Sequence, residues 1–211
     1  MIHENSIQKN ILRAETRLKE LRDTGSIKNL TDIEKIEIKM FYEKQCLKRF
    51  QTAKLLYAIS KDTDMKRLNN IPIDYTDYAE IVATSYYSMY YIIHAYIAGM
   101  YNIKIADDTR GIHAITHQLV LYYLVKTGKL ANYLYKEYIA TLTEATRIQK
   151  IDIEEFQKKA YIYAEIYDDI REARETFTYR TTSEAEEENA SKIIKTAETF
   201  INTIRQLMRK Q

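Results

Sequence analysis

Histidine is the side chain best suited to proton transfer or metal binding, and two of the four histidines, His113 and His117, lie four residues apart. On a helix this spacing places both imidazoles on one face, where they could share a metal ion. Zinc needs a third ligand and usually a fourth, and no H-E-x-x-H or Cys-rich pattern supplies them. We therefore expect a polar helix face there, with no metal and no other cofactor.

Tyrosine is unusually frequent, with 19 Tyr and no Trp in 211 residues. The densest run is Tyr86 to Tyr91 (YYSMYY), followed by His94. Rings at positions i, i+1, i+4 and i+5 of a helix cannot all face one core, so some are expected to meet another helix, another subunit or a polar groove. His94 is expected to be partly buried with its hydrogen bonds satisfied.

A second group of tyrosines surrounds a turn that contains three lysines. Basic and aromatic residues interleaved in this way can hold phosphates and stack bases. Tyrosines at helical spacing also serve as half-buried packing residues with a solvated hydroxyl, and the sequence leaves both roles open. The group consists of Tyr122, Tyr123, Tyr133, Tyr135 and Tyr138 with Lys126, Lys129 and Lys136.

The composition favours one all-helical domain. With 45% hydrophobic and 29% charged residues, the chain can build one sizeable core. It contains only 4 Gly and 1 Pro, so few sharp turns are available and long helices are favoured over sheets. The 32 basic and 30 acidic residues nearly cancel, so any RNA-binding surface would have to be local.

The single cysteine, Cys46, excludes an intramolecular disulfide and fits a reducing compartment. Residues 1–19 carry several charges without an unbroken apolar core, so they do not resemble a secretory signal. No segment has the roughly 20 uncharged apolar residues that a spanning helix needs, and residues 81–103 predict a buried helix instead. We expect a cytoplasmic protein that does not enter a membrane.

Periodic apolar residues predict helices at about 4–23, 33–59, 76–101, 109–126, 131–148, 152–178 and 184–207. Residues 102–108 are expected to form a loop, and residues 61–70 with Pro72 a break. Thr31 with Glu34 resembles a capping pair, and Asp74 or Thr76 is expected to cap the helix that follows the break. The period of the second helix runs through Ile33, Ile36, Met40, Leu47, Phe50, Leu55 and Ile59.

Several segments resemble motifs of the HEPN superfamily. The run from Tyr86 to Tyr91 resembles the signature Y-Y-x-M-[FY]-[HYF]-A, and residues 109–112 (TRGI) resemble the polar-His-[KR]-Gly segment that opens the next helix. Residues 124–130 (LVKTGKL) closely resemble the F-V-K-T-G-x-L turn. Residues 171–186 resemble the R-x-x-[AS]-x-Y and S-x-E-x-A-E block, so that the resemblance covers about residues 40–207.

HEPN proteins are small all-helical proteins of prokaryotes that include RNA-cleaving toxins and their non-catalytic relatives. The resemblance implies an all-α, antiparallel helical bundle with a core of four to five helices over residues 31–211. Residues 1–30 would add an N-terminal helical extension. The subgroup that the chain resembles has no assigned function, so the resemblance implies a fold more directly than an activity.

HEPN ribonucleases use an R-x4-6-H motif, two copies of which face each other across a dimer without a metal. The arginine would hold the scissile phosphate and the histidine would move a proton. In this chain Tyr179 follows Arg174 at the position of the histidine, and Arg171 has no following histidine either. Because the unperturbed pKa of tyrosine is about 10, Tyr179 would be a poor general base at neutral pH.

Two roles stay open for these residues. Arg174 with Tyr179 could bind a phosphate and stack a base, which would retain recognition without most of the chemistry. Alternatively, Arg174 pairs with a carboxylate such as Asp169 or Glu175, and Tyr179 fills the end of its helix.

The sequence therefore predicts one of two functions. The first, which we favour, is an interaction or regulatory protein that forms a homodimer through the aromatic helix and the C-terminal region. The resemblance implies that it belongs to a toxin–antitoxin or defence-type system, with a minimal nucleotidyltransferase as protein partner and tRNA or single-stranded RNA as ligand. The second is a metal-independent endoribonuclease that uses Arg171, Arg174 and Tyr179 at a composite dimer site. Residues expected to line an RNA-binding or dimer groove are Tyr87, Tyr91, His94, Arg110 and Lys126.

Overall fold

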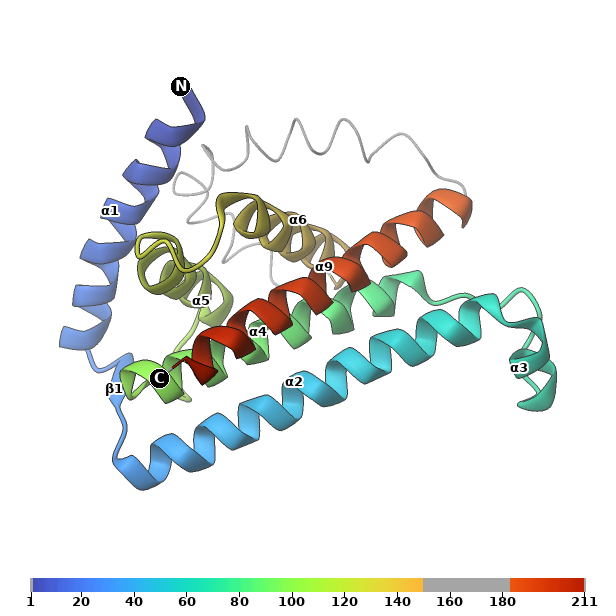
Figure 1. The fold of residues 1–211 in the computed structure, drawn as a ribbon, viewed down its shortest axis with the longest axis horizontal. Coiled ribbons are helices and arrows are strands. Elements are labelled where there is room, and N and C mark those ends of the chain that lie inside the picture. The colour runs from blue at the N-terminus through green and yellow to red at the C-terminus, as the bar shows by residue number, and fades with distance from the viewer. Residues whose placement is uncertain (1, 150–182, 211) are drawn as a thin grey trace.

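The computed structural model of the protein describes residues 2–149 and 183–210, which form a bundle of helices (Figure 1). This confirms the expected all-α bundle. A π-helical turn, η1 (Leu121–Val125), continues α5, and two short strands, β1 (Ile27–Asn29) and β2 (Ile103–Ile105), complete the structure of these ranges. The helices are α1 (Ile2–Asp23), α2 (Asp32–Lys61), α3 (Thr63–Leu68), α4 (Tyr78–Tyr101), α5 (Ile112–Val120), α6 (Asn132–Gln149) and α9 (Ser183–Arg209).

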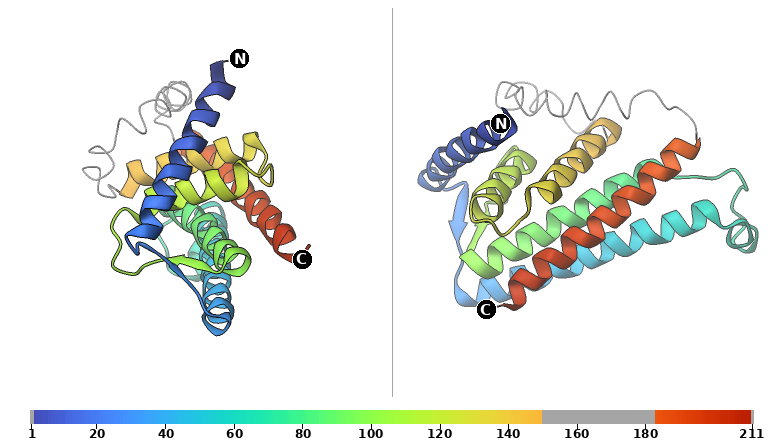
Figure 2. Two further views of the ribbon diagram at one scale, coloured as in Figure 1. Left: turned by 90° about the vertical axis from the view of Figure 1, so that its left-hand side faces the viewer. Right: turned by 45° about the horizontal axis from the view of Figure 1, so that its top comes forward.

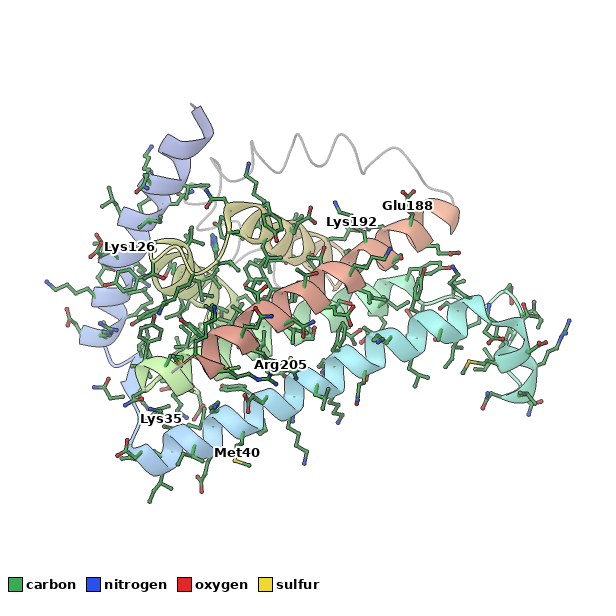
Figure 3. All side chains as sticks on the ribbon, viewed as in Figure 1. Lys35, Met40, Lys126, Glu188, Lys192 and Arg205 are labelled. Carbon is green, nitrogen blue, oxygen red and sulfur yellow. The ribbon has the colours of Figure 1, made fainter. Side chains whose placement is uncertain are left out.

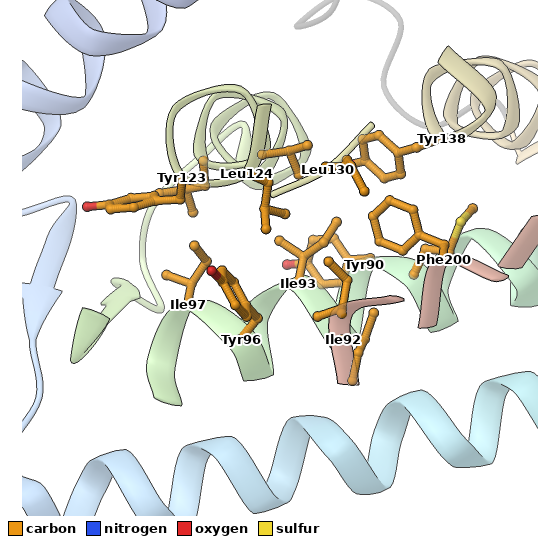
Figure 4. Packing of buried hydrophobic residues seen from close by; sticks show 14 of the residues in the cluster. Tyr90, Ile92, Ile93, Tyr96, Ile97, Tyr123, Leu124, Leu130, Tyr138 and Phe200 are labelled. Atoms are coloured by element: carbon orange, nitrogen blue, oxygen red, sulfur yellow. The ribbon is translucent and has the colours of Figure 1, made fainter. Parts of the chain in front are cut away.

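Helix α4 lies at the centre of the bundle and packs against α2, α5, α6 and α9 (Figures 1 and 2). It is apolar or aromatic on most of its circumference, and 17 of its 24 residues are buried. A helix with apolar residues all round must be covered on every side, which explains why the other helices gather around it. Figure 4 shows Tyr90, Ile93 and Tyr96 of α4 packed among Leu124, Leu130 and other core residues.

Helix α1 joins the same core through one apolar stripe. Ile11, Ala14, Leu18 and Leu21 are buried at spacings of three and four residues and cover α5 and η1. The extent predicted for this helix is thus confirmed. The division of the chain into domains at residue 30 stays a prediction.

The two strands correct the expectation that residues 102–108 form only a loop. β1 and β2 pair antiparallel, with Ile27 opposite Ile105 and Asn29 opposite Ile103. Isoleucines on one face of this ribbon are buried, so the pairing extends the apolar core while tying α1 to the end of α4. Asn102, in the left-handed conformation that asparagine tolerates, turns the chain from α4 into β2.

Helix α2 begins as the sequence predicts, with a capping box in which Thr31 and Glu34 bond each other's backbone N–H groups. Its predicted apolar stripe, however, does not face the core. Only Cys46, Ala53 and Ser60 of α2 are buried, at intervals of seven residues. These small side chains let α2 lie close along α4, and the large apolar residues of the stripe are left on the outside at Ile33, Ile36, Met40, Leu47 and Leu55.

The break between α2 and α4 also differs in detail. Asp62 accepts hydrogen bonds from the N–H groups of Asp64 and Met65 and so starts the short helix α3 inside the expected break. Asp77, rather than Asp74 or Thr76, caps α4, because its Oδ1 accepts the Glu80 N–H at 3.1 Å.

Gly111, with a φ of 71°, delays the start of α5 to Ile112, three residues later than predicted. The helix then widens into η1 and ends at Gly128, whose φ is also positive, as the Thr127-Gly128 pair predicts. Helix α9 confirms the last predicted helix, and its buried stripe includes Ile193, Ala197 and Ile201. The helix predicted at 152–178 lies outside the described residues.

The close contact between α2 and α4 predicts that larger side chains cannot replace the small residues of α2 without loss of stability. Ala53 is fully buried there, so Ala53→Leu should lower the free energy of unfolding by about 1–3 kcal/mol through overpacking. Ala58→Leu, on the exposed face of the same helix, is the matched control and should change it by less than about 0.5 kcal/mol. Urea denaturation followed by circular dichroism measures both, and equal effects would contradict the packing described.

Candidate functional site

Side chains able to do acid–base chemistry gather where α2, α4 and α5 meet. Ring centroids lie 4.4 Å apart for His94 and Tyr90, 5.1 Å for His94 and Tyr42, and 5.2 Å for Tyr90 and His113. We call this set the histidine–tyrosine cluster. It consists of Tyr42 on α2, Tyr86, Tyr87, Tyr90, Tyr91 and His94 on α4, and His113 on α5.

His94 is held by one hydrogen bond in the buried part of the cluster. Its Nε2 lies 2.9 Å from the Oγ1 of Thr116, and the Thr116 hydroxyl lies 2.7 Å from the carbonyl oxygen of Ile112. The hydroxyl has one proton, which it donates to that carbonyl, so it accepts from His94. This fixes His94 as the neutral tautomer with its proton on Nε2.

His113 and His117 point to different partners although they share one face of α5. The Nδ1 of His113 lies 2.8 Å from the hydroxyl oxygen of Tyr86 on α4. The Nε2 of His117 lies 2.7 Å from the hydroxyl oxygen of Tyr135 on α6, and the two rings stack at 5.8 Å. Each imidazole thus bridges α5 to a different helix.

Among the described residues, no third ligand lies beside His113 and His117 to complete a metal site. No group of three His, Cys, Asp or Glu side chains within the described residues is placed to hold an ion. The imidazoles of His113 and His117 instead contact tyrosine hydroxyls, and the helix face that carries them is turned inward.

Burial keeps these imidazoles uncharged. It lowers the pKa of His94 to about 3, with a smaller contribution from His113, and it lowers the pKa of His117 to about 4. The pKa of His113 is also lowered by burial. Burial raises the pKa of Tyr86 and of Tyr90, so the phenols stay protonated as well. At neutral pH the histidine–tyrosine cluster is a network of neutral groups.

The expected groove residues on α4 lie between helices of the same chain. Tyr87 and Tyr91 are half-buried, and Tyr91 stacks on Tyr42 of α2 at 6.0 Å. The guanidinium carbon of Arg49, also on α2, lies 5.9 Å from the centre of the Tyr87 ring. Another helix, another subunit and a polar groove were the three environments predicted for the aromatic run, and these rings meet another helix.

The second group of tyrosines lies in η1 and α6, on either side of the turn that joins them, and most of its rings are inside. Tyr123, Tyr135 and Tyr138 are buried, whereas Tyr133 is 65% exposed. Tyr138 stacks on Phe200 of α9 at 5.5 Å. Since three of the five rings pack in the core, they cannot offer the open stacking platform that RNA would need.

Two of the three lysines of this group, Lys126 and Lys129, already have partners. Lys126 Nζ lies 2.7 Å from a carboxylate oxygen of Glu15 on α1 and 4.7 Å from the centre of the Tyr122 ring. Lys129 Nζ donates to the hydroxyl oxygen of Tyr101 at 3.0 Å. The Lys126–Glu15 ion pair and a hydrogen bond from Arg22 to Tyr123 fasten α1 to η1 and the turn after it, whereas the Lys129 bond joins this turn to α4.

The other candidate residues are separate from the cluster or not described. Arg110 is exposed just before α5. Arg171, Arg174 and Tyr179 lie outside the described residues. Cys46 is buried against α4, and burial raises its pKa to about 12, so its thiol is not a nucleophile at neutral pH.

Thr116 and Tyr42 also belong to this site, although the sequence did not indicate either of them. Thr116 lies four residues after Ile112 and three after His113, so its place on the inner face of α5 follows from the helical period. Tyr42 could not be found in the same way, because only the packing of α2 on α4 brings it to His94.

Comparison with family models, with curated proteins and with solved structures gave no match to this chain. No helix in the ranges 2–149 and 183–210 is both long and apolar enough to cross a membrane. The function must therefore be inferred from the side chains of the chain itself.

The lowered histidine pKa values predict acid sensitivity. His94 and His117 titrate below the unfolded value of about 6.5, so the unfolded chain binds more protons and stability falls as the pH falls through that value. When the pH falls from about 7.5 to about 5.5, each histidine should lower the free energy of unfolding by about 1.4 kcal/mol. Urea denaturation at the two pH values measures the loss, and His117→Gln should lack its share. A stability independent of pH would contradict the burial of these imidazoles.

The Thr116 hydroxyl predicts a second effect on stability. Thr116→Val keeps the shape of the side chain but leaves the His94 Nε2–H without its acceptor, which should cost about 1–3 kcal/mol. Thr199→Val on α9 is the control, since that exposed hydroxyl bonds only the carbonyl of Lys195. Thermal unfolding followed by circular dichroism distinguishes the two, and equal shifts would remove Thr116 from the network.

Proposed function

We propose that this protein is a HEPN-like interaction protein without nuclease activity, which acts as a homodimer and regulates a partner protein in a toxin–antitoxin or defence-type system. The observation that supports this best is the state of its histidines. His94, His113 and His117 are each hydrogen-bonded to a hydroxyl on another element of the fold, and burial lowers the pKa of all three.

A general acid or base must reach its substrate and must have a pKa near the working pH. His94 and His117 are each only 4% exposed and titrate far below neutral pH. Removing their hydrogen bonds to engage a substrate would leave hydroxyl groups unpaired in the core. These imidazoles therefore suit the stabilisation of the bundle better than proton transfer.

The assignment to a HEPN-like protein comes from the resemblance of the motifs, and the fold is compatible with it. The aromatic run forms the central helix α4, and residues 124–130 form the turn after η1, which ends at a glycine with positive φ. Both motifs belong to the part of the chain that builds the bundle core.

The partners are proposed from the same resemblance. A minimal nucleotidyltransferase is the protein partner that it implies, with tRNA or single-stranded RNA as a further ligand. The described surface favours a protein, because large aliphatic side chains are exposed on α2 whereas three tyrosines of the Lys126 turn are buried.

RNA cleavage in the absence of metal tests this proposal. The purified chain, incubated with total tRNA or a single-stranded RNA in EDTA, should leave both intact, because Tyr179 replaces the histidine that a HEPN nuclease uses. Gel analysis of the RNA and of its ends gives the result. Binding of the same RNA, measured by a mobility shift, reports on recognition without cleavage.

Arg174→Ala and Tyr179→Phe variants serve as controls. Cleavage that leaves cyclic phosphate ends and is abolished by Arg174→Ala would overturn the proposal and establish a composite-site nuclease. Cleavage that persists in both variants would indicate a contaminating ribonuclease, and the assay is then repeated with protein purified to remove it.

A further inference from the structure

The outer face of α2 carries most of the large apolar side chains that the bundle leaves in solvent. Eleven large apolar residues are exposed in the described part of the chain, and six of them lie on this one helix. Their exposed fractions are 71% for Ile33, 58% for Ile36, 63% for Met40, 54% for Phe41, 43% for Leu47 and 54% for Leu55.

Four of these residues form one stripe rather than scattered points. At about 100° per residue, Ile33, Ile36, Met40 and Leu47 fall within one side of the helix. Figure 3 shows Met40 on the side of α2 away from α4 and α9, while Arg205 of α9 lies on the inner side. From Ile33 to Leu47 the stripe is about 21 Å long at 1.5 Å per residue. An apolar stripe of this length on a stable helix marks a docking surface.

Charged residues beside the stripe are arranged with opposite signs at its two ends. Glu34 and Glu37 lie beside its beginning, and Lys44 and Lys48 lie beside its end, all on the same flank. Neighbours three or four residues apart on this flank thus carry like charges, which is unfavourable on an isolated helix. Glu37, Lys44 and Lys48 form no ion pair within the described residues.

We propose that this face binds the same face of a second copy of the chain, with the two α2 helices antiparallel and crossing near Phe41. A two-fold axis there places Glu37 of each copy opposite Lys44 of the other, and Glu34 opposite Lys48. The same axis brings Ile36 onto Leu47 and Met40 onto its own symmetry mate. One register thus covers the apolar stripe and pairs the four charges.

A second copy explains the stripe better than RNA does. Isoleucine, methionine and leucine cannot stack on bases, and Glu34 and Glu37 would repel phosphates. An isologous interface requires a surface that complements itself after a two-fold rotation. The flank of α2 meets this requirement, because the rotation superimposes its acidic end on its basic end.

This inference rests on the proposed function, because both require a homodimer. It adds the surface through which the two copies bind. The sequence predicted a dimer contact through the aromatic helix α4, but Tyr87 and Tyr91 of α4 pack against α2 of the same chain. The outer face of α2 is on the opposite side of that contact, and its apolar side chains are exposed among the residues that the structure describes.

Substitution of the apolar stripe is the first part of the test. The full chain should sediment as a dimer at micromolar concentration, and Met40→Lys should convert it to a monomer. Leu12→Lys on α1 is the matched control, since Leu12 is 64% exposed and Met40 63%, and it should remain dimeric. Unchanged circular dichroism spectra establish that both variants fold.

Charge reversal tests the register. Glu37→Lys places like charges opposite Lys44, and Lys44→Glu does the same opposite Glu37, so each variant alone should raise the dimer dissociation constant about tenfold or more. The chain that carries both reversals should recover the original dimer dissociation constant, because each ion pair is restored with its charges exchanged. Mixing the two single variants should also give dimers, since every pair across a mixed interface is then attractive.

The outcomes separate this inference from the proposed function. A dimer that survives Met40→Lys and both charge reversals would overturn the α2 interface and leave a homodimer through another surface. A chain that stays monomeric at all accessible concentrations would overturn both the interface and the dimer of the proposed function. Dimers that weaken in the single variants without recovery on mixing would overturn the antiparallel register.

Discussion

The structure depends on the complete burial of α4. With 17 buried residues, this helix cannot exist without neighbours on every side, and the inward faces of α2, α5, α6 and α9 supply them. Its polar atoms must then be satisfied inside the protein, since an unpaired polar group in a core is costly. The hydrogen bonds of His94 to Thr116 and of Tyr86 to His113 meet this need and join α4 to α5.

The same constraint explains why the buried histidines and tyrosines of α4 and α5 are not available for acid–base chemistry. Imidazoles that bridge two helices in a core lose solvent, so their pKa values fall and they remain neutral. The phenols beside them are held protonated for the same reason. His94, His113 and His117, with the tyrosines they contact, thus join helices of the same chain, and the exposed side chains are left to mediate interactions.

Helix α2 has two faces that differ in the size of their side chains. Small residues, Cys46, Ala53 and Ser60, let it approach α4 closely, whereas large residues such as Ile33 and Met40 point outward. An outer face of large apolar side chains is costly for a monomer, because their apolar area stays exposed to water. A homodimer through the outer face would recover that cost, and the distribution of charge along the helix favours an antiparallel partner.

The sequence by itself determined the all-α class, the extents of α1 and α9, the Thr31 cap of α2 and the stop at Gly128, because these follow from local period and turn chemistry. It could not show that the apolar stripe of α2 faces outward, since periodicity identifies a face but not its partner. Nor could it place Tyr42 beside His94 or pair Ile27 with Ile105, residues far apart in the chain. Those contacts and the resulting pKa shifts were decided only by tertiary packing, because burial depends on which helices cover which faces.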